Sequence, residues 1–397
     1  MASTRQHIMI VAGEASGDLH GAHLARVLKQ QRPDLEICGV GGSHLKAEGI
    51  ALLSSSDELA VVGVLEVVKK LKTVWRVYKH LSRYLTERRP DVLLLIDYPE
   101  FNLRLARAAH KLNIPIVYYI SPQVWAWRSN RVKLIRRLVT KMIVIFPFEQ
   151  TFYASHGVDV EWVGHPLVES VTPSQSKEAF CQQHGLSAIQ PIIGLLPGSR
   201  ESEVERLLPV MLAAAQQIRT QQPDVQFVLP LASSLEQSTL FQSALPSFIR
   251  LVRQQTYEAI QAADLVVTAS GTVTVETAIL ETPMIITYIV SPLTYWLGRL
   301  FINVPFIGMV NLIADKQVAV ELIQDQAAPR AIAQEVLTLL QQPEQLEHIR
   351  RELRTVRRKL GEPGAAERAA AVILEVLNNA ARTSDVTTRI KKKQEFS

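Results

Sequence analysis

The stretch Ile192-Ile193-Gly194-Leu195-Leu196-Pro197-Gly198-Ser199-Arg200 is an apolar run that ends in a proline, a glycine and two polar residues. This pattern predicts a buried β-strand followed by a tight turn and the start of a helix. A second apolar run ends in Ser270-Gly271-Thr272 in the same way. Small residues let the backbone approach a ligand, and the free N–H groups at the start of a helix bind phosphate. The two junctions therefore predict a phosphate-binding site in the second half of the chain.

Two charged residues accompany these junctions. Arg200 supplies a forked cation that can bridge phosphate oxygens, and Glu276, one turn beyond Thr272, can accept hydrogen bonds from ribose hydroxyls. The alternative is that the glycines only form tight turns and that Arg200 pairs on the surface with Glu203 or Glu205. Because two junctions of the same kind occur, we favour a nucleotide-sugar pocket. Its expected residues are Gly198, Ser199, Arg200, Ser270, Gly271, Thr272 and Glu276.

The composition is that of a folded protein without a strong charge bias. The chain has 397 residues, of which 47% are hydrophobic, and 43 basic and 38 acidic residues give a net charge of +5. This length predicts two domains, and so small a charge gives no indication of nucleic acid as a partner. Cys38 and Cys181 are far apart, so we expect neither a disulfide framework nor a zinc site. With no export signal in the first residues, we expect a cytoplasmic protein.

Short runs of valine, isoleucine and leucine alternate with amphipathic stretches along most of the chain. Continuous apolar runs are typical of parallel strands that helices cover on both faces. We therefore predict an α/β fold with two doubly wound, Rossmann-like domains that face a cleft, followed by C-terminal helices. The expected strands are Ile8–Ala12, Ile37–Val40, Val92–Ile96, Ile116–Ile120, Met142–Phe146, Ile192–Leu196, Gln226–Leu229, Leu265–Thr268 and Met284–Tyr288.

A polar stretch that contains Thr172-Pro173-Ser174-Gln175-Ser176 is the best candidate for an interdomain linker. The expected organisation is a domain over 1–165, a linker over 166–190, a domain over 191–350, helices over 351–380 and a basic, disordered tail over 381–397. Between Thr282 and Ala314 the only charge is Arg299, but prolines divide this segment. We expect a core strand and an apolar loop or helix there rather than a membrane span.

The first half of the chain carries carboxylates after its expected strands. In residues 11–18, Glu14 and Asp18 would repel a pyrophosphate but can, together with Ser16, bind the hydroxyls of a sugar acceptor. The alternative is that Ser16 or Asp18 caps the helix that follows. Asp97 ends a buried run, at the edge where open α/β sheets place catalytic groups. We predict that Asp97 is a general base for an attacking hydroxyl, with Glu14 in the same catalytic site; helix capping is the alternative for Asp97.

Aromatic and basic residues indicate two further surfaces. Trp125 and Trp127, in the segment that begins at Ser121, can form a platform for a sugar or an acyl chain, or pack in the core. An amphipathic helix is expected between Leu65 and Leu85, and it either lies on an anionic membrane surface or packs on the sheet. Its expected membrane contacts are Lys69, Lys70, Lys72, Trp75 and Arg76. The apolar region around Trp296 and Phe301 is a second candidate for membrane docking.

Together these motifs resemble those of the lipid-A-disaccharide synthase family. The resemblance rests on residues 11–18, 96–102, 121–127 and 195–200, on Ser270-Gly271-Thr272 and on Asn311, and it extends from about residue 8 to about residue 380. The chain departs from the family at Tyr98-Pro99-Glu100, where Ala-Pro-Asp is frequent, and at Gln123, where serine is frequent. These positions lie beside the candidate catalytic residues, so the departures concern acceptor binding rather than the reaction.

The resemblance implies an inverting glycosyltransferase with the B-type fold, in which the first domain binds the acceptor and the second binds the UDP-sugar. It implies transfer of 2,3-diacylglucosamine from UDP to the 6-hydroxyl of 2,3-diacylglucosamine 1-phosphate, which forms the β-1,6-linked disaccharide of lipid A biosynthesis. The residues expected to bind acceptor or substrate are Ser16, Asp18, Ser121, Trp125, Trp127 and Asn311. We expect no cofactor and no metal, because no Asp-x-Asp motif lies near the predicted pocket.

The expected partners are UDP-diacylglucosamine, diacylglucosamine 1-phosphate and an anionic membrane, at the cytoplasmic face of the inner membrane. A homodimer is left open. One alternative function is that of a UDP-sugar 2-epimerase, which uses a similar nucleotide pocket without a second substrate. Another is a two-lobed solute-binding protein, which normally carries an export signal. Release of UDP that depends on an added acceptor distinguishes the transferase from both.

Overall fold

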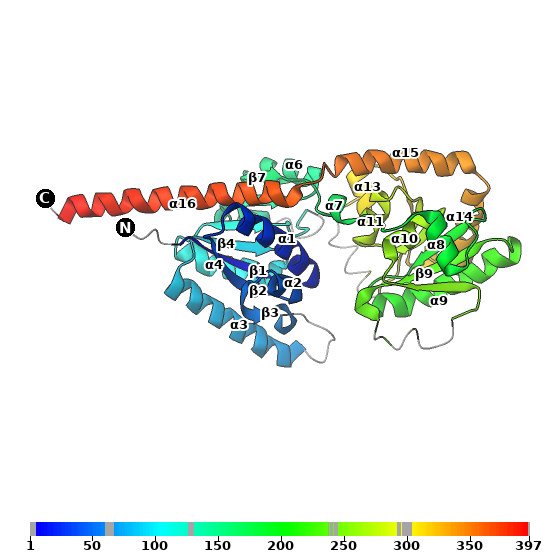
Figure 1. Cartoon of the computed structure of the whole chain (residues 1–397), viewed down its shortest axis with the longest axis horizontal. Helices are drawn as coiled ribbons and strands as arrows, with labels where there is room; N and C mark the ends of the chain where they lie inside the picture. The colour runs from blue at the N-terminus through cyan, green and yellow to red at the C-terminus, as the bar shows by residue number, and fades with distance from the viewer. Residues whose placement is uncertain are drawn as a thin grey trace. The chain divides into compact units, whose positions relative to one another are not determined.

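The computed structural model describes residues 5–59, 67–125, 131–236, 238, 241, 245–291, 295 and 304–395, with side chains at all of these except 57, 67–71, 233 and 381–395. The chain forms two compact units (Figure 1). The first unit contains Met1–Pro166 and Glu362–Ser397, and the second contains Leu167–Gly361. The first unit is therefore assembled from two separate segments of the sequence.

Within the described residues, the first unit is built on a seven-stranded parallel sheet with the order β3-β2-β1-β4-β5-β6-β7. Its strands are β1 (His7–Ala12), β2 (Glu36–Gly41), β3 (Ala51–Ser55), β4 (Val92–Ile96), β5 (Ile116–Tyr119), β6 (Lys141–Val144) and β7 (Val160–Trp162). Its helices are α1 (Ala15–Gln31), α2 (Ser43–Ala47), α3 (Val67–Arg88), α4 (Pro99–Lys111), α5 (Arg131–Leu138), α6 (Pro147–Ser155) and α16 (Ala365–Glu395).

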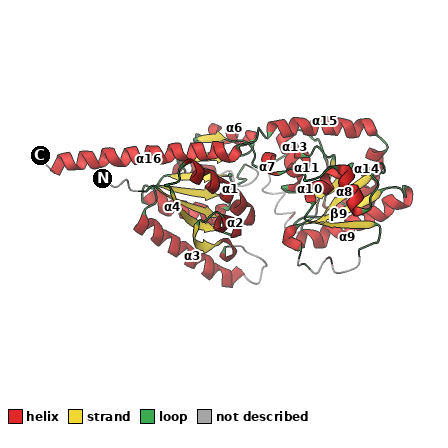
Figure 2. Cartoon of the chain, viewed as in Figure 1, coloured by secondary structure: helices red, strands yellow, loops and turns green. Residues whose placement is uncertain are grey.

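Helices cover both faces of this sheet (Figure 2). Met9 and Val11 of β1 join one buried cluster with residues of α3, α4 and α5. On the opposite face, Gly21 of α1 packs close to Ile10 and Ile96, and α16 lies along α1, β4 and β5. Burial on both faces explains why the central strands are continuous apolar runs in the sequence.

In the part of the chain that the structure describes, the second unit is built on a six-stranded parallel sheet with the order β10-β9-β8-β11-β12-β13. Its strands are β8 (Ile192–Leu196), β9 (Gln226–Leu231), β10 (Ile249–Arg253), β11 (Leu265–Ala269), β12 (Met284–Tyr288) and β13 (Val320–Ile323). Its helices are α7 (Leu167–Ser170), α8 (Lys177–His184), α9 (Glu201–Gln221), α10 (Thr256–Ala262), α11 (Val273–Ile279), α13 (Met309–Ala314), α14 (Pro329–Leu340) and α15 (Pro343–Lys359).

The two parallel-sheet units confirm the predicted α/β fold class. The organisation along the sequence differs from the expected one in two places. The stretch 166–190, expected as a linker, forms α7 and α8 of the second unit, because Glu258 accepts hydrogen bonds from Ser174 and Asp264 pairs with Lys177. The tail expected to be disordered continues α16 to Glu395, since neither proline nor glycine interrupts 365–395.

Among the helices that the structure describes, we find none that is both long enough and apolar enough to cross a membrane. The strand expected after Thr282 is β12. Much of the apolar segment that follows it, including Trp296 and Phe301, lies outside the described residues.

Candidate active site

In each sheet the chain leaves two neighbouring central strands in opposite directions. In the first unit, β1 leads to β2 and β3 on one side, whereas β4 leads to β5, β6 and β7 on the other. Parallel α/β sheets bind ligands beyond the carboxyl ends of the strands at such a switch point. Ala12 ends β1 and pairs with Ile96, which ends β4. The loops that begin at Gly13 and Asp97 therefore lie side by side at the edge where a ligand is expected.

Asp97 is half-buried at this edge. Burial raises the pKa of Asp97 to about 6, and the nearby carboxylates of Glu14 and Glu100 act in the same direction. Asp97 is therefore a stronger base than an ordinary aspartate and is mostly ionised at neutral pH. It does not cap the following helix, because the N-cap of α4 is Tyr98 and forms no side-chain capping bond.

The residues of the Glu14 loop divide into an exposed group and a structural one. Glu14 is exposed at the N-cap of α1 without a side-chain capping bond, and Ser16 is exposed one residue into the helix. Asp18 is only 2% exposed, and its carboxylate accepts hydrogen bonds from the backbone N–H groups of Gly42, His44 and Leu45. These bonds, 2.6 to 3.2 Å long, cap the start of α2. The oxygens of Asp18 therefore hold the start of α2, and its contact with the acceptor stays a prediction.

Position 13 requires glycine because the side chain of Tyr98, in the neighbouring loop, lies against it. A Cβ atom at Gly13 would collide with the ring of Tyr98, which lies directly against the backbone there. Tyr98 also stacks on Phe101, and its hydroxyl donates to the carbonyl oxygen of Leu59 at 2.9 Å. Tyr98 stands where the related motif frequently has alanine. Its ring is thus packed between the two loops of the switch point.

Ser121 and Trp125 share a buried partner that the sequence analysis missed. The Ser121 hydroxyl and the Trp125 indole N–H both donate to Oε1 of Glu149, at 2.7 and 3.0 Å. The other carboxylate oxygen accepts the backbone N–H of Phe146 at 3.1 Å, at the start of α6. Burial raises the pKa of Glu149 to about 7, although these hydrogen bonds favour its charged form. The sequence signal that could have identified Glu149 was Pro147 at the first helical position, followed by a glutamate at the third.

The second unit has the same kind of switch point between β8 and β11. From there β8 leads to β9 and β10, whereas β11 leads to β12 and β13. Leu196 pairs with Thr268, so the loops after these strands are neighbours. Gly198 has φ +118°, a conformation that side chains disfavour. A Cβ atom added at Gly271 would meet no atom within 4 Å, so packing does not demand glycine there and the backbone is open to a ligand.

The surface pairing considered for Arg200 is present in the structure. Nη1 of Arg200 lies 3.1 Å from Oε1 of Glu203, and Oε2 of Glu203 accepts the Ser199 N–H at 3.2 Å. The Arg200 side chain is 76% exposed, so this ion pair is weak. The hydroxyl of Ser234 donates to the Ser199 carbonyl oxygen at 2.7 Å and holds the turn. Glu203 thus pairs with Arg200 and with the Ser199 N–H, the two donors that were expected to bind phosphate.

Glu276 lies half-buried on α11, which follows the second junction. Burial raises its pKa, and the hydroxyl of Tyr257 donates to Oε1 at 3.4 Å, which acts in the opposite direction. Tyr257 was not singled out in the sequence because a single tyrosine in a helix carries no pattern. Ser270 donates its hydroxyl to the Ile307 carbonyl oxygen at 3.2 Å, whereas Thr272 is exposed.

Asn311 has a structural role rather than the expected substrate contact. It is fully buried, and its Oδ1 accepts the backbone N–H groups of Val318 and Ala319. Its Nδ2 donates to the Ala319 carbonyl oxygen and to Glu321, each at 2.8 Å. The amide ties α13 to the start of β13 and has no capacity left for a substrate. Asn311 therefore serves the fold here, and the structure does not show the predicted substrate contact.

Helix α3 packs on the sheet, as one of its two interpretations predicted, and it leaves basic and aromatic side chains exposed. Val77 and Leu81 pack in the core, while Trp75 on the other side is 54% exposed. Nζ of Lys79 lies 5.5 Å from the centre of the Trp75 ring. Lys72, Trp75 and Arg76 are exposed, the side chains of Lys69 and Lys70 lie outside the described set, and so does the whole of Trp127.

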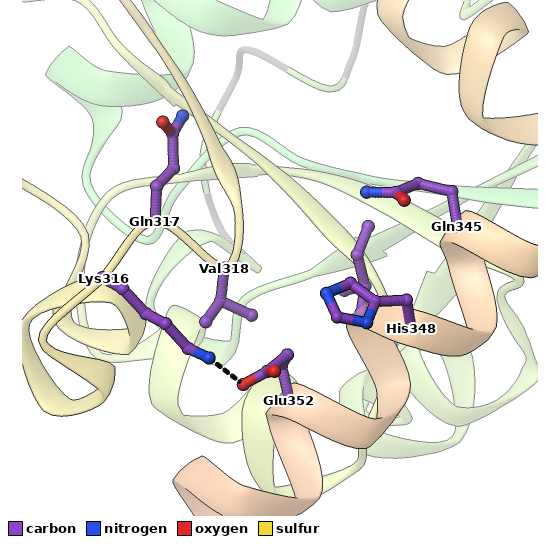
Figure 3. Close-up of a pocket in the computed structure, with 7 residues that line it drawn as sticks. Lys316, Gln317, Val318, Gln345, His348 and Glu352 are labelled. Carbon is purple, nitrogen blue, oxygen red and sulfur yellow. Dashed lines mark ion pairs between the residues drawn. The ribbon is translucent and has the colours of Figure 1, made fainter.

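A hollow in the second unit lies between the residues just before β13 and helix α15 (Figure 3). It is lined by Lys316, His348 and Glu352, among others, and Lys316 pairs with Glu352 at 2.7 Å. Its volume of about 120 Å³ is smaller than the ~300–1,000 Å³ typical of small-molecule sites. Among the described side chains, no group of three or more His, Cys, Asp or Glu residues is placed to hold a metal ion.

The chain is similar over nearly its whole length to a known family. The family model of lipid-A-disaccharide synthetase matches residues 8–376. The lipid-A-disaccharide synthase of Syntrophus aciditrophicus (strain SB) is 48% identical over 373 residues, which cover 93% of this chain and 97% of that protein. The lipid-A-disaccharide synthase of Geobacter metallireducens is 45% identical over 374 residues, with 94% and 97% covered.

Solved structures of two kinds of enzyme share the fold. The S. aureus MnaA–UDP structure has a TM-score of 0.64 at 15% identity and covers 94% of this chain and 97% of that chain. The calicheamicin glycosyltransferase CalG4 has a TM-score of 0.60 at 15% identity, with 96% and 100% covered. The UDP-GlcNAc 2-epimerase of Neisseria meningitidis, bound to UDP-GlcNAc, has a TM-score of 0.61 at 15% identity, with 94% and 100% covered. Glycosyltransferases and epimerases share this fold, so the fold does not choose between them.

Proposed function

Because the chain belongs to the lipid-A-disaccharide synthetase family, we propose that this glycosyltransferase moves 2,3-diacylglucosamine from UDP to the 6-hydroxyl of 2,3-diacylglucosamine 1-phosphate. The products are UDP and the β-1,6-linked disaccharide 1-phosphate. The observation that carries the proposal is Asp97, half-buried at a switch point with its pKa raised to about 6. A carboxylate of this basicity is ionised at neutral pH and can receive the proton of an attacking hydroxyl.

In the proposed reaction, Asp97 takes the proton of the acceptor hydroxyl while O6 attacks C1 of the donor sugar. The O6–C1 bond forms, the bond from C1 to the diphosphate oxygen breaks with its electron pair, and the configuration at C1 inverts. Glu14 supports the basicity of Asp97 and, with Ser16 and Ser121, binds acceptor hydroxyls. Trp125, fixed by Glu149, offers an aromatic surface to the sugar or an acyl chain, and we assign the same role to Trp127.

The second switch point holds the nucleotide in this proposal. The diphosphate accepts hydrogen bonds from the Ser199 N–H and the backbone of the Gly271–Thr272 turn, and Arg200 neutralises the charge that develops on departing UDP. Glu203 must then release Arg200 and Ser199, which its exposed, weak ion pair allows. Glu276 accepts the ribose hydroxyls, with Tyr257 as its neighbour.

Acceptor-dependent release of UDP tests this function. Synthetic UDP-2,3-diacylglucosamine is incubated with the enzyme, with and without 2,3-diacylglucosamine 1-phosphate, and UDP and disaccharide are quantified. We expect equal amounts of both products, formed only when the acceptor is present. Conversion of UDP-N-acetylglucosamine to its C2 epimer without any acceptor would instead establish the epimerase alternative.

For the cellular location, we propose that the enzyme collects its acylated substrates at the cytoplasmic face of the inner membrane through α3. The exposed side of this helix carries Lys72, Trp75 and Lys79, three and four residues apart, and therefore on one face. Basic residues near an anionic surface contribute about 1 kcal/mol each, and an exposed tryptophan favours the interface. The buried side of α3 keeps the helix in place on the sheet.

Vesicle co-sedimentation tests this surface. Lys72→Gln/Lys79→Gln should weaken binding to phosphatidylglycerol-containing vesicles at low salt by ~30-fold, since two charges contribute about 2 kcal/mol. The control is Arg351→Gln/Arg358→Gln, which removes two exposed charges from α15. Equal binding by both folded variants would exclude α3 as the docking surface.

A further inference from the structure

The backbone at Asp97 has an unusual conformation. Asp97 has φ +44° and Tyr98 has φ +47°, so two consecutive residues with side chains adopt the left-handed region. Side chains disfavour this region, and the fold must compensate for it through other contacts. Strain of this kind gathers at functional sites, where it aims a particular group.

Two buried side chains converge on one backbone oxygen, the carbonyl of Asp97. Nδ2 of Asn102 donates to it at 2.7 Å, and the hydroxyl of Tyr118 donates to it at 2.6 Å. The same Nδ2 also lies 3.1 Å from the Ile96 carbonyl oxygen. Both side chains are fully buried, at 0% exposure. Asn102 belongs to α4 and Tyr118 to β5, so two separate elements fix this peptide group.

Burying the Tyr118 hydroxyl and the Asn102 amide lowers the stability of the fold. Tyr118 belongs to the apolar cluster between the sheet and α3, α4 and α5. Among the described residues, Oδ1 of Asn102 has no hydrogen-bond partner, although it is buried. Burying polar atoms without full pairing is unfavourable, so an apolar residue would serve packing alone better. What the two side chains do provide is a fixed direction for the Asp97 carbonyl group.

We propose that Asn102 and Tyr118 are positioning residues, which hold the left-handed Asp97–Tyr98 turn and thereby aim the Asp97 carboxylate at the acceptor hydroxyl. The inference rests on the proposed function, in which Asp97 is the base. Neither side chain touches the carboxylate or a reacting atom in the proposed reaction. They act through the backbone: without them the turn relaxes towards the extended or right-handed regions, and the carboxylate swings out of line. A misplacement of about 1 Å can reduce a rate by ~10²-fold.

Tyr118→Phe is the decisive variant, since it removes one hydroxyl and keeps the ring. We expect kcat to fall by about tenfold, and by about a hundredfold in Tyr118→Phe/Asn102→Ala, with UDP affinity within twofold of the parent protein. The acidic limb of the kcat profile should also move to lower pH, because a relaxed Asp97 is better solvated and burial is the main cause of its raised pKa. A purely structural role would change thermal stability without moving this limb.

Tyr84→Phe is the matched control. The Tyr84 hydroxyl is also partly buried in the first unit, but it contacts Cys38 and His7, and His7 begins β1 at the opposite edge of the sheet. This variant should keep kcat within twofold and leave the limb unchanged. If the double variant does not fold, Tyr118→Phe and its control still decide the question.

Asp97→Asn, measured beside these variants, separates the two hypotheses. Suppose that Asp97→Asn is inactive while Tyr118→Phe keeps the full rate and the acidic limb of its kcat profile does not move. This result would overturn the positioning role and leave the base assignment standing. An active Asp97→Asn would overturn the base assignment, and with it the reason to position this carboxylate. Loss of rate in Tyr118→Phe, with the shifted limb and intact UDP binding, supports both.

Discussion

At the β1–β4 edge of the first unit the carboxylates of Glu14 and Asp97 follow the strands, whereas at the β8–β11 edge of the second unit glycine turns and Arg200 follow them. The strand order reverses at both edges, which is where parallel α/β sheets bind ligands. The first edge carries two carboxylates, whereas the second combines Arg200 and open backbone with the carboxylates of Glu203 and Glu276. One edge suits a hydroxyl that must lose a proton, and the other suits a diphosphate that must leave. Under the proposed function, the topology sets where each substrate binds, and the loops set which chemical group is recognised.

Asp97→Asn should have the largest effect, confined to the first edge. Asparagine keeps the shape but cannot take a proton, so kcat should fall by roughly 10²–10⁴-fold, while calorimetry should give an unchanged Kd for UDP. Glu100→Gln is the control, because this exposed carboxylate lies three residues further on, in the first turn of α4, and pairs with Arg131 at 2.8 Å. A comparable loss in both variants would mean that the acidity of the loop matters and not the base.

Arg200→Ala and Glu276→Ala should show the complementary behaviour at the second edge. Each should weaken UDP binding by about 1.5–3 kcal/mol, or roughly 10- to 150-fold, because each loses a charge-assisted hydrogen bond. Arg206→Ala removes an exposed arginine of the same helix, α9, and should leave the Kd unchanged. If Arg200→Ala and Glu276→Ala bind UDP like the parent protein, the nucleotide lies elsewhere.

The pH dependence of the rate should report the Asp97 carboxylate at the first edge. Because the pKa of Asp97 is raised to about 6, its ionised fraction, and with it the rate, should fall about tenfold per pH unit below 6 and level off above about 7. Since Glu14 helps to raise this pKa, Glu14→Gln should move the acidic limb to lower pH. If the acidic limb of the rate profile stays in place in Glu14→Gln, Glu14 does not influence the pKa of Asp97.

Glu203→Gln should have the smallest effect and the opposite sign. The Glu203 carboxylate holds both Arg200 and the Ser199 N–H, so its removal should free two donors and tighten UDP binding a few-fold, or by up to about 1 kcal/mol. Glu205→Gln removes an exposed charge two residues further along α9 and serves as the control. Weaker UDP binding in Glu203→Gln would mean that this carboxylate orients Arg200 rather than competing for it.

The strands that the sequence predicted and those it missed differ in their place in the sheet. Central strands such as β4 and β8 are buried along their whole length, so the apolar run is visible without knowledge of the fold. The missed strands, β3, β7, β10 and β13, are the four edge strands of the two described sheets, and they are only partly buried. Partial burial permits polar residues, which removes the signal.

The candidate site shows a similar division. Asp97 and Arg200 stand out as candidates because they follow apolar runs, and this position is visible in the local sequence. Asp18 and Asn311 stand in equally distinctive motifs, yet their partners are backbone groups 24 to 27 and 7 to 8 residues away. A motif does not reveal whether a polar side chain serves the fold or a ligand. Glu149 was missed for the converse reason, because its role arises only when the loop at Ser121 folds against α6.

Helix α16 belongs to the first unit but follows the second unit in the sequence, so the first unit is completed last during synthesis. Residues 365–380 include Ala369, Ile373 and Leu377, which are buried against α1 and the strands β4 and β5. Arg368 also donates to the carbonyl oxygen of Val163, just before the chain enters the second unit. During translation, this layer leaves the ribosome only after the whole of 167–361 has been made. Until 365–380 emerge, the nascent first unit therefore leaves the part of this face along β4 and β5 uncovered, and apolar surface exposed in this way favours aggregation.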